Sequence, residues 1–120
     1  MKQRLIRFSL ACTLFALPLC TQTSSASPAT ITGEITDSIC APNGSHTAVM
    51  QMNPTMGRDD ESCAKRCAQL GARYVLYDST TKKVYTLDDQ AKAAALAGHE
   101  VRVTGSITGS GIAVTSMAAA

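Results

Sequence analysis

The first 26 residues have the pattern of an export signal, and this pattern decides how much of the chain is left to fold. Residues 1–7 carry three cations and no acid, residues 8–20 form an apolar run, and small and polar residues follow as far as Ala26. This order is typical of a secretory signal peptide, and the small residues at its end predict cleavage after Ala26. We therefore predict that residues 1–26 are a signal peptide and that residues 27–120 form one small exported domain, either periplasmic or secreted.

The apolar run also admits two other interpretations. One is an uncleaved membrane anchor, although Pro18 interrupts the run and its 13 residues fall short of the roughly 20 that a spanning helix needs. The other is a lipoprotein attached through Cys20, but Leu19 stands where lipoprotein signals have a small residue. We therefore expect no stable membrane anchor after cleavage.

Cleavage changes the composition of the part that folds. It leaves 94 of the 120 residues and removes three of the 11 Lys and Arg residues but none of the 9 acids, so the net charge becomes about −1. The only aromatic side chains left are Tyr74, Tyr77 and Tyr85. A domain this small has a marginal core, so a disulfide or a bound metal would stabilise it noticeably. The charge and the few aromatic residues also argue against a nucleic-acid partner.

Alternating β-branched and apolar residues predict five strands. In the first, Ile31, Gly33 and Ile35 share one face, which is the period-two pattern of a half-buried strand. The glycine inside it predicts a bulge or a tight bend. Two other stretches begin with acids and stop at a glycine, which predicts short helices. The expected strands are 30–36, 73–77, 83–87, 100–107 and 112–117, and the expected helices are 59–70 and 89–97.

The order of these elements predicts a fold that is mainly β with two short helices, in the α+β class. Five strands with a helix between the third and fourth match a small five-stranded OB-like Greek-key barrel. Residues 37–58, expected to be a loop, and the first helix form a cysteine-bearing insertion between the first two strands. Asp88 is expected to cap the second helix, and residues 118–120 are expected to fray. The alternative is an open sheet with the helices packed on one face.

Three cysteines remain after cleavage, and with one histidine they form a candidate metal site. Cys63 and Cys67 are four residues apart on the expected helix, so their side chains share one face. Cys40 ends the first strand region, and His46 follows six residues later. Three thiolates and an imidazole suit tetrahedral zinc, or copper(I) with fewer of them bound. Three thioethers between the histidine and the helix are candidate auxiliary ligands for copper(I): Met50, Met52 and Met56.

A disulfide is the competing interpretation of the same cysteines. Exported proteins meet oxidising conditions, and small ones use disulfides. A bond from Cys40 to Cys63 or to Cys67 would close a loop of about 24–28 residues and contribute roughly 3 kcal/mol. Side chains four apart on a helix match disulfide geometry poorly, so a bond between the two helical cysteines is less natural. Any single disulfide leaves one thiol over.

Thiol–disulfide redox chemistry is a third hypothesis. Cys63 lies in the first turn of its expected helix, where the helix dipole favours a thiolate, but the neighbouring acids at 59–61 oppose it. The spacing of the helical pair has three residues between the cysteines, whereas oxidoreductases of the thioredoxin kind have two. The sequence also contains no Ser-His-Asp series, phosphate loop or pair of catalytic carboxylates. A non-enzymatic module is therefore expected.

Five short motifs lie in a fixed order along residues 27–120. They occupy residues 31–40, His46, and residues 63–67, 71–76 and 101–105. Together they resemble a family of small exported bacterial domains of unknown function. The resemblance implies a β-rich, barrel-like body with a first cysteine, a nearby histidine and a later cysteine pair. That family has no established activity, so the resemblance supports the domain and not a function.

Overall fold

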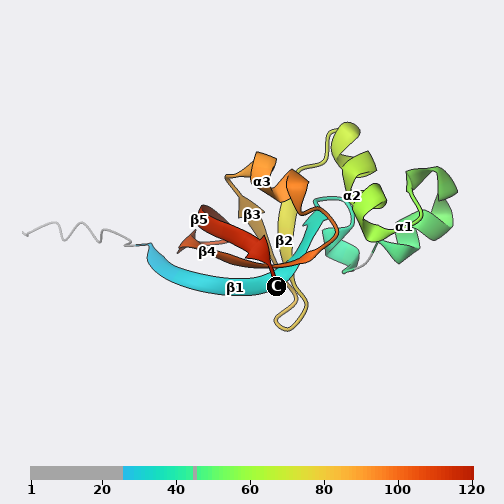
Figure 1. Cartoon of the computed structure of the whole chain (residues 1–120). Helices are drawn as coiled ribbons and strands as arrows, with labels where there is room; N and C mark the ends of the chain where they lie inside the picture. The colour runs from blue at the N-terminus through green and yellow to red at the C-terminus, as the bar shows by residue number, and fades with distance from the viewer. Residues whose placement is uncertain (1–25, 45) are drawn as a thin grey trace, which may run out of the picture.

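The computed structural model describes residues 26–44 and 46–120, and in them the chain is mainly β. Five strands form one mixed sheet, and three α-helices and two short 3₁₀ turns accompany it (Figure 1). The elements, in chain order, are β1 (Ser27–Asp37), η1 (Ala41–Asn43), α1 (Thr47–Met52), η2 (Pro54–Met56), α2 (Asp60–Gln69), β2 (Tyr74–Asp78), β3 (Lys83–Leu87), α3 (Gln90–Ala95), β4 (Glu100–Thr108) and β5 (Gly111–Ala119).

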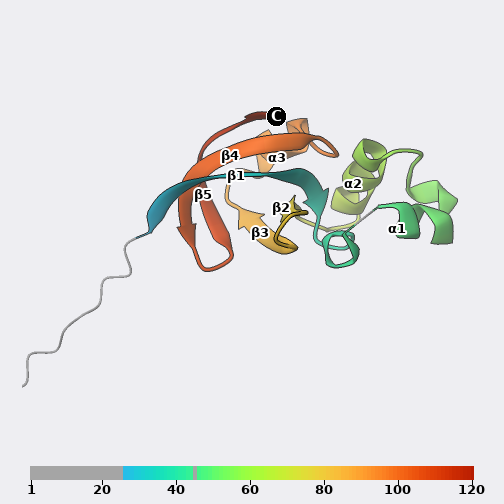
Figure 2. The same cartoon turned by 90° about the horizontal axis from the view of Figure 1, so that it is seen from below.

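The first strand organises the sheet because both of its edges are paired. The first part of β1 runs antiparallel to β4, from Ser27 opposite Ile107 to Glu34 opposite Glu100, and its last four residues run antiparallel to β2. The strand order β1-β2-β3-β5-β4 therefore returns to β1. The contact of β3 with β5 is the one parallel pairing among these strands. The long curve of β1 across the sheet is visible in Figures 1 and 2.

A single apolar core fills the interior of the sheet. Its strand members follow the period-two pattern, since Val101 and Val103 are buried while Arg102 between them is exposed. The helices contribute only small side chains, with Ala64 from α2 and Ala93 from α3. The buried members of this sheet core are Ile35, Ala64, Leu76, Leu87, Ala93, Ala97, Val101, Val103, Ile112 and Met117.

The connection from β1 to β2 leaves the sheet and forms a separate helical lobe. It carries η1, α1, η2 and α2, which lie to one side of the strands in Figures 1 and 2. Helix α2 begins with a capping box, in which the Asp59 side chain accepts a hydrogen bond from the Ser62 amide at 2.8 Å. The turn after α3 contacts this end of α2, because a Cβ atom added to Gly98 would lie 2.5 Å from Glu61 Cα.

The structure confirms the mainly β fold with five strands, and it corrects several details. There are three α-helices rather than two, because α1 lies in the stretch that was expected to be a loop. Asp89 caps α3, not Asp88, which instead accepts a hydrogen bond from the Val114 amide. The tail does not fray, since Ala118 and Ala119 belong to β5 and pair with β4.

Two further expectations concern the signal peptide and a membrane anchor. The predicted signal peptide covers residues 1–26, and all of these except Ala26 lie outside the described residues. Among residues 26–44 and 46–120, no helix is long and apolar enough to cross a membrane.

Candidate metal site

The three cysteines meet in the helical lobe. Cys63 and Cys67 lie one turn apart on α2, which places their sulfurs on one helix face, and Cys40 faces them from the segment that follows β1. All three side chains are fully buried free thiols, and their sulfurs lie within 4.8 Å of one another. Sulfurs this close can share one metal ion, whose bonds to thiolate are about 2.3 Å long for zinc.

Two of the three candidate methionines lie against these sulfurs. Met56, at 9% exposure, belongs to the same buried cluster, and Met50 is partly buried against it. Met52 is 77% exposed and is not part of the cluster. The packing therefore supports Met50 and Met56 as auxiliary ligands, and Met52 stays a prediction without such support.

The surroundings of the cysteines hold their thiols in the protonated form. Burial raises the pKa of Cys40 far above its usual range, and the neighbouring Asp37 carboxylate raises it further. Burial and the same carboxylate raise the pKa of Cys67 to about 11, and burial also raises the pKa of Cys63. A metal ion would therefore have to displace protons from all three thiols on binding. Raised thiol pKa values also disfavour the nucleophilic thiolate that redox catalysis needs.

His46 is buried beside the cysteines, on the side of β1. Its side chain is 2% exposed, its Nε2 lies 2.9 Å from Thr36 Oγ1 and 3.3 Å from Glu34 Oε1, and its Nδ1 lies 3.6 Å from Asp37 Oδ2. Burial lowers the pKa of His46, but the Glu34 and Asp37 carboxylates raise it more, so the net pKa lies above the usual value.

The predicted four-ligand set is divided into two groups that share one cysteine. The first group holds the three sulfurs, and the second joins Asp37, Cys40 and His46, whose ligand atoms also lie within 4.8 Å of one another. His46 therefore meets Cys40 but does not complete one compact set with all three cysteines. Sequence analysis missed Asp37, which is fully buried. Its only signal was its position three residues before Cys40.

Local backbone geometry explains why Asp37 turns inward. Its Oδ1 accepts hydrogen bonds from the amides of Ile39 and Cys40 at 2.9 and 3.0 Å. These bonds form a tight turn at the end of β1, which fixes the carboxylate and the cysteine on the same side of the chain. The second oxygen, Oδ2, is buried and has no hydrogen-bond partner.

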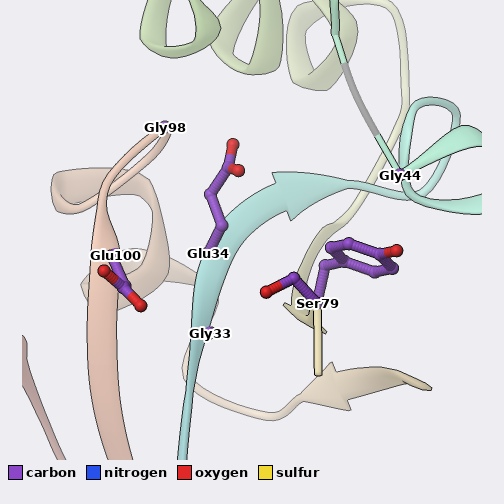
Figure 3. A pocket seen from close by; sticks show the side chains of 7 residues that line it. Gly33, Glu34, Gly44, Ser79, Gly98 and Glu100 are labelled. Carbon is purple, nitrogen blue, oxygen red and sulfur yellow. The ribbon is translucent and has the colours of Figure 1, made fainter. Parts of the chain in front are cut away.

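A pocket open to solvent lies on the Glu34 side of the histidine. It has a volume of about 400 Å³, and Glu34 and Glu100, from the paired strands β1 and β4, both contribute to its lining. In Figure 3 the Glu34 side chain extends between the turn at Gly98 and the loop at Gly44. Because Glu34 is 33% exposed and also contacts the buried His46, it bridges the pocket and the second ligand group.

Comparisons with known proteins assign neither a family nor a function to this chain. No family model matches the chain, and neither a curated protein nor a solved structure matches it. The resemblance to small exported bacterial domains therefore stays a prediction.

Proposed function

We propose that this protein is an exported, non-enzymatic domain that binds a soft metal ion, copper or zinc, through Cys40, Cys63 and Cys67. One observation carries the proposal, namely three fully buried sulfurs within 4.8 Å of one another in a chain of this size. Thiolates are preferred ligands of both metals. A carrier or sensor of such an ion fits a small domain that offers no sign of a catalytic nucleophile.

The surroundings of the sulfurs support both metals in different ways. Copper(I) accepts two or three soft ligands, and Met56 belongs to the cysteine cluster while Met50 packs against that cluster. Zinc in structural sites takes four ligands in tetrahedral geometry, for which three thiolates need one further donor. The methionines therefore favour copper(I), whereas the nearby carboxylate and imidazole favour zinc.

The fold around the site is proposed to be an OB-like Greek-key barrel. The strand order β1-β2-β3-β5-β4, with a return to β1 and a helix between β3 and β4, supports this assignment. The metal-binding lobe is then an insertion between the first two strands. Export to the periplasm or outside the cell, and membership of the resembled family, belong to the same proposal and rest on the sequence patterns.

A disulfide-bonded module without metal is the second candidate, because the same proximity favours it. A bond from Cys40 to either Cys63 or Cys67 would leave the remaining thiol buried beside it. Redox catalysis has less support, since burial raises the pKa of every one of these thiols.

Native mass spectrometry of the mature protein, purified from an exported compartment without added thiol, tests the proposal. We expect a bound metal that is lost on denaturation, together with three thiols that can then be alkylated. A protein without metal, about 2 Da lighter than the reduced chain and with one alkylatable thiol, would instead establish the disulfide.

A matched pair of variants tests the thioether ligands. Met56→Leu should weaken binding of copper(I) and leave zinc binding unchanged, because leucine fills a similar volume without the sulfur. Met52→Leu is the control, since this exposed side chain lies outside the cluster. Equal copper(I) affinity in both variants would remove Met56 from the ligand set.

A further inference from the structure

Two buried polar atoms face each other beside Cys40 without a hydrogen-bond partner. They are Asp37 Oδ2 and His46 Nδ1, which lie 3.6 Å apart. Both side chains are almost completely buried, at 0% and 2% exposure. Buried polar groups are nearly always paired, so two unpaired groups at one point in a small domain call for a physical cause.

The contacts of the imidazole indicate which nitrogen keeps its proton when an ion binds. Nε2 lies against Thr36 Oγ1 and Glu34 Oε1, and a carboxylate can only accept a hydrogen bond. Nδ1 faces Asp37 Oδ2 in the same way, so without an ion both ring nitrogens favour a proton. If an ion displaces one proton, Nε2 can keep its own toward Thr36 and Glu34, and Nδ1 is the nitrogen that turns its lone pair toward Asp37. Metal-binding histidines use this arrangement, in which one ring nitrogen donates to an oxygen and the other binds the ion.

Hydrogen bonds also fix the orientation of the Asp37 carboxylate. Its Oδ1 already accepts two backbone hydrogen bonds, so Oδ2 offers its lone pairs toward the same point as Nδ1. Two lone pairs that face each other away from water repel, unless a proton or a metal ion lies between them. The thiol of Cys40 completes the group, with all three ligand atoms within 4.8 Å of one another.

We propose that Asp37, Cys40 and His46 bind a second metal ion, and that the Cys40 thiolate bridges it to the ion held by Cys40, Cys63 and Cys67. The bridging part of this inference rests on the proposed function. A carboxylate oxygen, a thiolate and an imidazole nitrogen form a mixed donor set of the kind that zinc accepts. The second ion is therefore a divalent ion of the zinc class.

The balance of buried charge supports two ions rather than one. With a neutral, metal-bound imidazole, three thiolates and the Asp37 carboxylate carry four negative charges, which two divalent ions neutralise, while the Glu34 carboxylate is 33% exposed and partly solvated. One divalent ion would leave two negative charges in a buried site, which is costly. Among the ion pairs of the described residues, the partner of Asp37 is His46 and no Lys or Arg.

The second site is separated from a solvent-open pocket by the Glu34 side chain. Glu34 lines the pocket in Figure 3 and contacts the His46 ring from the β1 side. A hydrated cation that entered this pocket would meet the carboxylates of Glu34 and Glu100 before it reached the imidazole. The three-sulfur centre lies deeper in the lobe, among Met56 and the residues of α2.

Native mass spectrometry with Zn²⁺ and the mature protein tests the stoichiometry. We expect two zinc ions on the wild-type protein and one on Asp37→Asn. Asparagine keeps the oxygen that accepts the two backbone hydrogen bonds, and its amide group can donate to His46 Nδ1. Asp78→Asn is the matched control and should keep two ions, because Asp78 occupies a comparable turn at the β2–β3 hairpin.

The outcomes separate the two proposals. One zinc ion on both wild type and Asp37→Asn overturns the second site and leaves the three-sulfur centre standing, with Asp37 and a protonated His46 as a plain buried ion pair. No zinc on the wild-type protein overturns the second site and the zinc form of the proposed function, and a parallel titration with copper(I) then decides the three-sulfur centre. Two ions that persist in Asp37→Asn show that the second ion lies elsewhere, which also overturns the inference.

The bridge is tested on wild-type protein loaded with Co²⁺, so the result does not depend on whether a variant folds. High-spin Co²⁺ gives an electron paramagnetic resonance signal, and a shared thiolate couples two such ions. We expect the signal to grow with the first equivalent and to fall with the second. Unbound Co²⁺ is removed before each spectrum because it also gives a signal. A signal that then doubles with the second equivalent would mean two separate sites and would overturn the bridge, and a signal that stays constant would overturn the second site.

Discussion

The sheet core and the cysteine cluster are both buried, but they consist of different types of side chain. Branched apolar side chains from all five strands, such as Leu76 and Val101, make up most of the sheet core. The cluster in the helical lobe has four fully or nearly buried members, Cys40, Met56, Cys63 and Cys67, and every one of them contains sulfur. Packing of the sheet core removes apolar surface from water, whereas packing of the cysteine cluster brings sulfur atoms together.

This difference implies that the two regions depend on different forces. The strands have continuous backbone pairing, and burial of their apolar side chains supplies the main driving force. The lobe has two short helices, and α1 has six residues and no side-chain cap. Helices of this length are marginal without tertiary contacts. We therefore expect the sheet to be stable by itself and the lobe to need a cross-link through its sulfurs.

The largest effect is expected from a cavity in the sheet core. Leu76→Ala removes a fully buried side chain from β2, which should lower the free energy of unfolding by about 2–5 kcal/mol. The loss should be similar with metal and with chelator, because Leu76 belongs to the sheet core and not to the cysteine cluster. Denaturant unfolding followed by far-ultraviolet circular dichroism measures both values. A loss that appears only with metal bound would contradict the separation of the two regions.

Metal removal is expected to act on the other region. A bound ion at a hundredfold excess over its Kd stabilises a protein by about 2.7 kcal/mol, and a chelator removes this contribution. Hydrogen exchange should then accelerate at the amides of α1 and α2 and stay slow in β1 and β4. Equal acceleration in all four elements would show that lobe and sheet unfold as one unit.

The same contrast explains what the sequence could predict. The strands were predictable because buried and exposed residues alternate along them, as Val101, Arg102 and Val103 do. Helix α2 was predictable from its acidic start and its glycine stop. Helix α1 was not, because six residues without a cap carry too little pattern. The tail residues Ala118 and Ala119 have no strand preference of their own, and their order comes from backbone pairing with β4.

The candidate site was predictable in its residue types but not in its grouping. Helical spacing alone placed Cys63 and Cys67 on one face. The position of His46 depends on the turn at the end of β1, where Asp37 bonds to two backbone amides. That turn brings the histidine to Cys40 from the side of Glu34, away from a common set with the helical cysteines. A distance along the chain contains no information about such a turn.

A smaller effect is expected where the two regions touch. Gly98 has a φ of 76°, and an added Cβ would meet the backbone of Glu61 in the first turn of α2. Gly98→Ala should therefore cost roughly 1–3 kcal/mol through backbone strain, and it should also push α2 away from the sheet. The displacement should be visible as a lower metal affinity.

The matched control for this contact is Gly109→Ala, in the turn between β4 and β5. Gly109 has a φ of 60°, but an added Cβ would have no neighbour within 4 Å. This variant should show the strain of a left-handed alanine and an unchanged metal affinity. If both variants lower the metal affinity equally, the contact between Gly98 and α2 does not position the cysteines.

The smallest expected effect is a pH dependence of the stability of the start of α2. Hydrogen bonds from the Ser62 backbone and side chain lower the pKa of Asp59 below its usual value. A group whose pKa is lower in the folded state contributes stability above its unfolded pKa, and this contribution is lost as the pH falls through the folded pKa. We therefore expect the protection of the α2 amides, measured relative to intrinsic exchange at the same pH, to fall as the solution becomes acidic in that range.

Carboxyl carbon shifts in nuclear magnetic resonance measure this titration directly. Asp59→Asn keeps a good helix cap without a titrating group, so its α2 amides should lose this dependence on pH. Asp78 provides a comparison in the sheet, because hydrogen bonds from Thr81 and Thr80 lower its pKa in the same direction. Acid should therefore loosen the β2–β3 turn through Asp78 and α2 through Asp59, each at its own folded pKa. An Asp59 carboxyl that titrates at its usual pKa would show that the cap is not formed, and α2 would then depend on its sulfurs alone.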